Sequence, residues 1–236
     1  MRAIGDQVFL LPLPLREGVG GRGACAPDPS AQPPPSRGGG GFWARRDTVV
    51  VFARAPRLGA VKRRLAREIG ARAALRFHTA TLTRLLRLLA ADRRFRTVLA
   101  VTPDRAALRL PHRVIRLAQG RGDLGQRMGR VFQQFPHGRL AIIGCDIPDA
   151  NAADVVAAFR SLGRADAVFG PAVDGGYWLV GMSPRRPARP FAAVRWSTRH
   201  ALADTLANFS SRRVTLLRTL HDVDTAADWR SVHAAC

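Results

Sequence analysis

Three shortages limit what this 236-residue chain can be before any motif is considered. It holds only three cysteines, Cys25, Cys145 and Cys236. They are widely spaced, so neither a disulfide framework nor a metal-binding CxxC pair is present, and a reducing, cytoplasmic location is expected. No apolar run approaches the ~20 residues that a membrane-spanning helix needs, so we expect no membrane partner. The apolar stretch 8–15 is short and contains two prolines, which makes it a poor signal peptide.

Lysine and glutamate are almost absent. Of 38 Lys+Arg residues, Lys62 is the only lysine, and of 17 acidic residues only two are glutamates. Arginine therefore dominates the formal net charge of +21, which by itself suggests a nucleic-acid partner. No zinc-finger spacing, helix-turn-helix pattern or aromatic RNA-binding signature accompanies the charge. A GC-rich codon bias together with an anionic small substrate explains it better, and a nucleic-acid-binding protein stays a weaker alternative.

Residues 1–46 differ in composition from the rest. They are rich in Pro and Gly and lack any period, which predicts a disordered tail or linker. Residues 14–18 and 35–39 echo each other as translated inverted repeats can, so we hypothesise a true start near Arg46. A genuine flexible tail is the alternative. Residues 47–236 are expected to form one α/β domain.

From Asp47 onward, strand and helix patterns alternate. Strands are predicted over 48–53, 97–101, 114–117, 140–144, 166–170, 177–182 and 214–217. Helices are predicted over 124–135, 151–162, 198–209 and 225–232, besides a helical stripe from 65 to 89 that is interrupted near Gly70. This alternation indicates a mostly parallel sheet covered on both faces, whose ligands bind beyond the carboxyl ends of the strands.

The loop after the first predicted strand is the first candidate site. Pro56 and Gly59 end the strand pattern, and apolar positions 61, 65 and 69 resume at helical spacing. A basic loop that enters a helix N-terminus suits an anion, and the single lysine places a compact ammonium there for a phosphate. The alternative is a lysine that survived codon bias by chance. The loop is not a P-loop, because Arg63 rather than Ser or Thr follows Lys62.

Aspartates recur at later strand ends. Asp146 follows a buried strand and Asp224 follows the last one, and such separated carboxylates suit a metal-bridged phosphate. Each cluster also has a structural interpretation: a tight loop around Gly122, a turn cap at Asp146, a hairpin at 174–176 and an N-cap at Asp224. Their joint occurrence favours a site over four separate coincidences.

These motifs, taken in order, resemble the glycosyltransferase-like family related to 2-phospho-lactate guanylyltransferase, within the nucleotide-diphospho-sugar transferase superfamily. The matching residues are Phe52–Pro56, Gly59, Val61–Lys62, Arg64–Leu65, Gly122–Gly125, Arg127–Met128, Gly144, Asp146, Pro148, Gly170–Ala172, Asp174–Trp178, Trp196–Thr198 and Asp222–Thr225. The resemblance implies a Rossmann-like three-layer α/β/α sandwich with a mixed, mostly parallel sheet. It also implies a nucleotide site in the first half and a second substrate in the second half. The chain departs from the family at Arg63, Cys145 and Ile147, where Thr, Ser and a small residue or Cys are usual.

The resulting prediction is a metal-dependent transferase that uses a nucleoside triphosphate or a sugar nucleotide and a small acceptor. Lys62, Asp146 and Asp224 are the predicted catalytic residues, and the two aspartates would hold Mg²⁺ or Mn²⁺. The predicted nucleotide-binding residues are Ala53, Arg54, Ala55, Gly59, Lys62, Arg64, Gly122, Asp123 and Arg127. The predicted acceptor-binding residues are Asp174, Gly175, Gly176, Tyr177, Trp196, Ser197 and Thr198. A non-catalytic nucleotide-binding protein is the main alternative, and the base, the acceptor and the oligomeric state stay open.

Overall fold

A computed structural model describes residues 46–234, with side chains as far as residue 232. The segment expected to form a tail, residues 1–46, lies outside the described residues except for Arg46. The strands are β1 (Thr48–Arg54), β2 (Arg96–Thr102), β3 (Val114–Ala118), β4 (Leu140–Gly144), β5 (Ala167–Pro171), β6 (Tyr177–Met182) and β7 (Val214–Leu216). The helices are α1 (Arg63–Ile69), α2 (Ala71–Ala91), α3 (Leu124–Gln134), α4 (Ala152–Ser161), α5 (Ala201–Ala207) and α6 (Ala226–Ala234).

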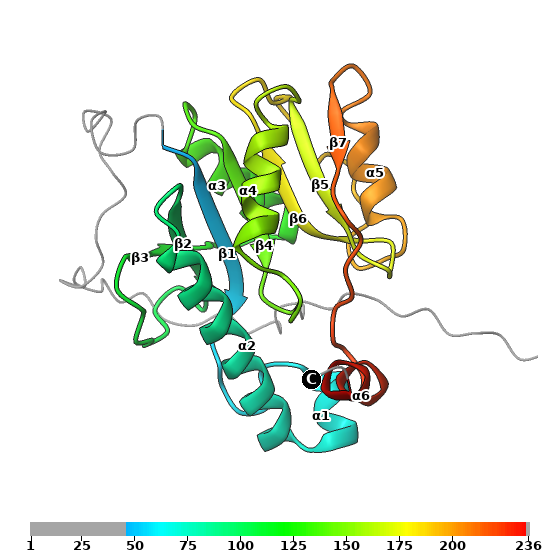
Figure 1. Ribbon diagram of the computed structural model, residues 1–236. Helices are drawn as coiled ribbons and strands as arrows, with labels where there is room; N and C mark the ends of the chain where they lie inside the picture. The colour runs from blue at the N-terminus through cyan, green and yellow to red at the C-terminus, as the bar shows by residue number, and fades with distance from the viewer. Residues whose placement is uncertain (1–45, 235–236) are drawn as a thin grey trace, which may run out of the picture.

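All the described strands belong to one mixed sheet of order β3-β2-β1-β4-β6-β5-β7 (Figure 1). β6 runs antiparallel to both of its neighbours, β4 and β5, whereas the other pairs are parallel. The centre of the sheet is built from β-branched residues, and Val49, Val50 and Val51 of β1 are fully buried. A strand buried on both faces needs apolar side chains at successive positions, which explains why β1 shows no alternation.

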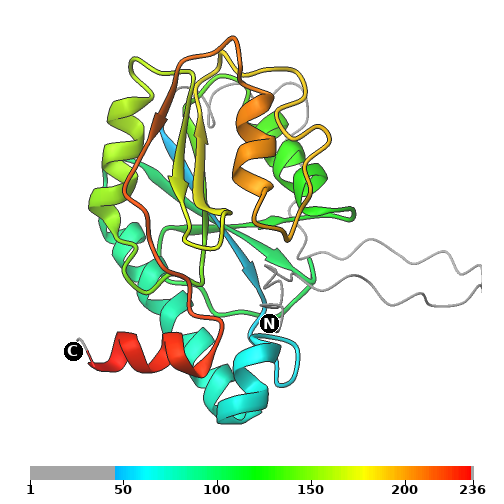
Figure 2. The same ribbon diagram turned by 90° about the vertical axis from the view of Figure 1, so that its right-hand side faces the viewer.

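Helices cover both faces of the sheet, as the view in Figure 2 shows. The core on one face joins Leu82, Leu85 and Leu89 of α2 to Val155 and Phe159 of α4. The core on the other face contains Met128, Val131 and Phe132 of α3, and Leu202 and Leu206 of α5 pack against it. The three-layer α/β/α sandwich with a mixed, mostly parallel sheet is therefore confirmed.

One edge of the sheet gathers the predicted motifs. Arg54, at the end of β1, pairs with Thr102 of β2, and Phe52 pairs with Gly144 at the end of β4. The turn between β5 and β6 lies at the same edge, because β6 runs antiparallel. Beyond this edge α1 and α6 pack with the first turns of α2 around Leu65 (Figure 1). The fold thus brings loops that are far apart in the chain to one place.

The predicted elements agree with the observed ones within a few residues, except at α5. That helix was expected from residue 198 and begins at Ala201. Ser197 has a positive φ of 64°, and the N–H of Ala201 bonds to the carbonyl of Thr198, so a turn precedes the helix. No helix in the described part of the chain is both long and apolar enough to span a bilayer.

Candidate active site

Lys62 lies buried at the centre of the carboxyl-edge loops, with only 4% of its side chain exposed. Its Nζ is 2.9 Å from Oδ1 of Asp224 and 3.2 Å from Oδ2 of Asp146. Burial disfavours the charged ammonium, but the two carboxylates outweigh it, so the pKa of Lys62 is raised above its usual value. The backbone of Lys62 has a left-handed conformation (φ 46°, ψ 49°) immediately before α1. Three predicted catalytic residues from three separate loops therefore meet.

Asp146 is fixed from several sides. Its backbone carbonyl accepts a hydrogen bond from the N–H of Val223, which ties the end of β4 to the segment that carries Asp224. Burial raises the pKa of its carboxyl, but Lys62 and then His78 oppose it more strongly, so this pKa lies well below the usual range. The carboxylate is consequently ionised, and its side chain makes no turn cap. Its geometry favours a site over the capping interpretation.

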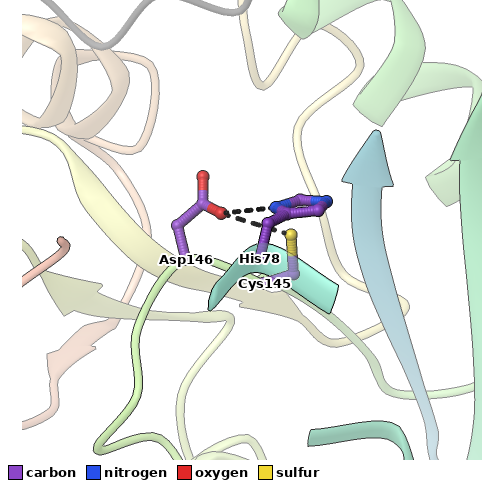
Figure 3. Close-up of side chains that lie close together, drawn as sticks. All are labelled: His78, Cys145 and Asp146. Atoms are coloured by element: carbon purple, nitrogen blue, oxygen red, sulfur yellow. Dashed lines mark hydrogen bonds and ion pairs between the residues drawn. The ribbon is translucent and has the colours of Figure 1, made fainter. Parts of the chain in front are cut away.

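His78 and Cys145 lie beside Asp146, as Figure 3 shows, and neither was among the predicted site residues. Nδ1 of His78 is 3.6 Å from Oδ1 of Asp146, and Sγ of Cys145 donates a 3.4 Å hydrogen bond to the same oxygen. Nε2 of His78 lies 3.0 Å from the carbonyl oxygen of Arg54, which links α2 to the end of β1. Burial raises the pKa of the Cys145 thiol well above its usual value. His78 escaped prediction because it falls within the apolar stripe of a helix, where a buried core residue is expected.

The segment after β7 brings two aspartates to the site. Asp224 does not cap α6, contrary to one interpretation of the sequence. Asp228 instead accepts hydrogen bonds from the N–H groups of Asp224 and Thr225, and from the Thr225 hydroxyl. The Asp224 side chain is thereby left for Lys62. Burial, followed by the nearby Asp224 and Asp174, raises the pKa of Asp222 to about 6.

Asp222 was part of a quoted motif but not a predicted site residue. Asp222 could have been proposed as a site residue from its position two residues before Asp224, because acidic residues are few in this chain, 17 of 236.

A group of arginines lies around the end of β1. Burial and the nearby Arg63 lower the pKa of Arg54, and burial, Arg54 and Arg130 lower that of Arg127. Guanidinium groups that repel one another in this way create a local positive potential that favours binding of an anion. Nη1 of Arg127 donates to Oε1 of Gln119 at 2.8 Å, and Nε2 of the buried Gln119 donates to the carbonyls of Ala53 and Ala100. Gln119 was not predicted, and it holds Arg127 against the end of β1.

Other predicted nucleotide-binding residues have structural roles. The N–H of Ala55 donates to the carbonyl of Thr102 at 2.8 Å, so this amide is not available to a phosphate. Asp123 is the N-cap of α3 and forms a capping box with Gln126. Gly122, at φ 105°, lies so close to the Gln126 side chain that a Cβ there would meet its Oε1 at 2.1 Å. Gly59 also has a positive φ, and Arg64 reaches 4.0 Å from Oδ2 of Asp224.

The predicted acceptor residues form two turns that pack together. Gly175 has φ 85°, and a Cβ on it would lie 2.2 Å from the carbonyl oxygen of Arg199. The N–H of Gly176 bonds to the Asp174 side chain at 2.8 Å, and the N–H of Leu202 bonds to the carbonyl of Gly175. Glycine is thus required at 175 for both its conformation and the close approach of residues 196–202, which include Ser197 and Thr198.

Tyr177 and Trp196 belong largely to the core. Their rings are 6.5 Å apart in an edge arrangement, and Tyr177 also packs edge-on against Phe169. The phenol of Tyr177 lies 3.5 Å from the Thr205 hydroxyl, and burial raises its pKa. Trp196 contacts α3 at Gly125, where a Cβ would lie 2.8 Å from the indole. Both residues were predicted to bind the acceptor, but these contacts already occupy much of the surface of their rings, and the acceptor role stays a prediction.

Comparison with known proteins gives the following. Residues 85–198 match a family model described as "Uncharacterized protein conserved in bacteria (DUF2064)". A presumed nucleotide-diphospho-sugar transferase from Desulfovibrio desulfuricans G20 is 27% identical, with a TM-score of 0.75 over 81% of this chain and 87% of that chain. A 4-diphosphocytidyl-2C-methyl-D-erythritol synthase from Anaerococcus prevotii DSM 20548 is 9% identical, with a TM-score of 0.54 over 81% and 98%. No curated protein matches the chain.

Proposed function

We propose that this chain, whose structure resembles that of a nucleotide-diphospho-sugar transferase, transfers a nucleotidyl or glycosyl group from a nucleoside triphosphate or a sugar nucleotide to a small acceptor. The observation that carries the proposal is the contact of Lys62 with Asp146 and Asp224 at the carboxyl edge of the sheet. Cationic and anionic groups meet there, as a substrate with phosphates and a counter-ion requires.

The carboxylates of the site fit a divalent cation. Asp146, Asp174, Asp222 and Asp224 gather around a single buried ammonium, that of Lys62. Their mutual repulsion contributes to the raised pKa values of Asp174 and Asp222, so the cluster is short of positive charge. Carboxylate oxygens are the ligands that Mg²⁺ and Mn²⁺ prefer. Asp146 and Asp224 would hold the ion, which when bound neutralises the negative charge of the transferred phosphate group.

The chain's own residues supply position and charge. Arg54 and Arg127 attract the phosphates, and Gln119 keeps Arg127 at the end of β1. Lys62 contributes a buried positive charge at the junction of the phosphates and the carboxylates. The two turns around Gly175 and Thr198, which pack together, are the proposed binding region for the acceptor. None of these residues has to act as a covalent nucleophile, because transfer of this kind relies on alignment and electrostatic stabilisation.

A ligand panel with product analysis tests the proposal. The folded protein is heated with each nucleoside triphosphate and with sugar nucleotides, with and without Mg²⁺ or Mn²⁺. A ligand at 100 times its Kd should stabilise the protein by about 2.7 kcal/mol. Release of pyrophosphate from a triphosphate would support nucleotidyl transfer, and release of a nucleoside diphosphate would support glycosyl transfer.

Asp146→Asn should lower turnover at least about 100-fold. Its matched control is Asp92→Asn, which removes the same charge at a surface pair with Arg94, away from the site. Stabilisation by a nucleotide without turnover, unaffected by Asp146→Asn, would instead indicate a non-catalytic nucleotide-binding protein. The proposal fails if no nucleotide or sugar nucleotide stabilises the protein. Weak DNA retention at physiological salt would exclude the nucleic-acid alternative.

A further inference from the structure

His78, Cys145 and Asp146 each bring one donor atom of different chemistry to a small cluster (Figure 3). The donor atoms are Nδ1 of His78, Sγ of Cys145 and Oδ1 of Asp146, and all lie within 4.8 Å of one another. His78 and Cys145 are 3% and 5% exposed, and the Asp146 side chain is 25% exposed, so the cluster is buried on the histidine and thiol side and open at the carboxylate. Lys62 contacts the other carboxylate oxygen, Oδ2. The two oxygens of Asp146 therefore face different partners.

The hydrogen bond on the far side of His78 defines what its Nδ1 can do. The partner of Nε2 is the carbonyl oxygen of Arg54, at 3.0 Å, and a carbonyl only accepts, so Nε2 carries the proton. The other ring nitrogen, Nδ1, is buried and faces Oδ1 of Asp146 at 3.6 Å, beyond hydrogen-bond distance. Either a proton on the ring or a metal ion bound by both atoms would join Nδ1 to this oxygen.

The spacing of the donors matches a tetrahedral ion. With metal–sulfur, metal–nitrogen and metal–oxygen bonds of about 2.3, 2.05 and 2.1 Å, tetrahedral angles place sulfur about 3.6 Å and nitrogen about 3.4 Å from the carboxylate oxygen. The observed separations are 3.4 Å for Sγ and 3.6 Å for Nδ1. These two separations are close to the tetrahedral ones, and Sγ lies within 4.8 Å of Nδ1. Small side-chain adjustments would complete the coordination.

We propose that His78, Cys145 and Asp146 form a binding site for Zn²⁺ or a similar borderline divalent ion, separate from the position between Asp146 and Asp224. Imidazole and thiolate ligands suit Zn²⁺, whereas Mg²⁺ requires oxygen ligands. Binding forms the metal–sulfur bond as the thiol proton leaves to solvent, so one proton is released for each ion bound. An ion there would fix the orientation of Asp146, because it would hold the Oδ1 that Lys62 does not contact. The site stands on its own donors and does not depend on the proposed transferase activity.

The direct experiment uses the full chain with Cys25→Ser and Cys236→Ser, so that Cys145 is the only thiol. Zn²⁺ and Co²⁺ are titrated against a competing chelator, without nucleotide. We expect one ion per chain and a sulfur-to-cobalt charge-transfer absorption. Cys145→Ser should abolish that absorption, and both it and His78→Gln should weaken the affinity at least tenfold, as loss of metal-site residues does. Asp224→Asn should leave Zn²⁺ binding unchanged, because Asp224 contacts Lys62, and Lys62 contacts Oδ2 of Asp146 rather than the Oδ1 that belongs to the cluster.

If a variant fails to fold, X-ray absorption spectroscopy of the Zn²⁺-loaded protein with Cys25→Ser and Cys236→Ser still identifies the ligands of the ion. One sulfur in the zinc coordination shell supports the site, and a shell of only oxygen and nitrogen overturns it. Binding that is insensitive to Cys145→Ser, or no binding at all, also overturns it. Because no nucleotide is present, these outcomes are independent of the transferase proposal. Turnover that requires Asp224 without any zinc binding would refute this site alone.

Discussion

Replacing Lys62 with methionine is the sharpest test of how the site is held together. Methionine preserves most of the side-chain volume and removes the charge, so Asp146 and Asp224 lose their shared ammonium. Removing one partner of a buried ion pair costs roughly 3–5 kcal/mol. The two carboxylates are 25% and 28% exposed, and water would offset part of this cost, so we expect a loss of about 2–4 kcal/mol in the free energy of unfolding at pH 7. For a chain of this size, that lowers Tm by about 5–15 °C.

The effect should depend on pH in a defined direction. Lys62 helps to keep the pKa of Asp146 well below its usual value in the folded state. Stability from such a depressed carboxyl is fully present above its unfolded pKa of about 3.9 and is lost as the pH falls through the folded pKa. In Lys62→Met the Asp146 carboxylate loses this stabilisation and protonates at higher pH, which removes its repulsion with Asp224. The stability difference between wild type and variant should therefore shrink from pH 7 toward pH 4.

Urea unfolding at a series of pH values measures this difference, provided that the m-values of the proteins agree. Arg64→Met is the matched control, because its guanidinium is 4.0 Å from Asp224, its side chain is 28% exposed, and its loss should cost less than about 1 kcal/mol. Adding Asp146→Asn to Lys62→Met should restore part of the lost stability. A Lys62→Met protein as stable as wild type at pH 7, or one that Asp146→Asn destabilises further, would refute the reasoning.

Three further predictions concern the surrounding loops. The pKa of Asp222 is raised to about 6, so its ionisation opposes folding as the pH rises from 4 through 6. In urea unfolding, Asp222→Asn should therefore stabilise the protein by about 2–3 kcal/mol above pH 7 and should have no effect below about pH 4. A gain in stability at pH 3 would contradict this. Gly175→Ala should lower the free energy of unfolding by about 2–4 kcal/mol, since φ at this position is 85° and the added Cβ would meet Arg199. Gly176 has an ordinary φ, so Gly176→Ala should cost less. Equal decreases in Tm for the two variants would contradict the packing argument. Asp123→Ala should lose about 1 kcal/mol of cap stability, and Asp123→Asn should retain it; lower nucleotide affinity in Asp123→Asn by calorimetry would support a direct role in binding.

Local pattern predicted most of the fold. Continuous apolar β-branched residues marked β1 and β4, and the break at Gly70 between α1 and α2 was expected from that glycine. Burial and backbone propensity act within a few neighbouring residues, so periodicity reports them well. The start of α5 was misplaced because the left-handed Ser197 and the turn before Ala201 depend on packing against Gly175, which periodicity does not contain.

The site was predicted in part. Lys62, Asp146 and Asp224 do meet, and their positions after strands made this foreseeable. His78 could not be predicted in the same way, because a histidine on an apolar helix face is ordinarily a core residue. Gln119 likewise became visible only through its bonds to Ala53, Ala100 and Arg127. In both cases the decisive partner lies on another element.

The sequence by itself determined where most strands and helices lie and that several strand-end aspartates recur with one lysine. Only the tertiary structure decided that β6 is inserted antiparallel between β4 and β5, and that Thr225, paired with Asp228, caps α6 so that Asp224 is left for Lys62. The physical reason is range. Propensity and periodicity act over a few residues, whereas Lys62 and Asp224 are 162 positions apart and meet only because their loops end at one edge of the sheet.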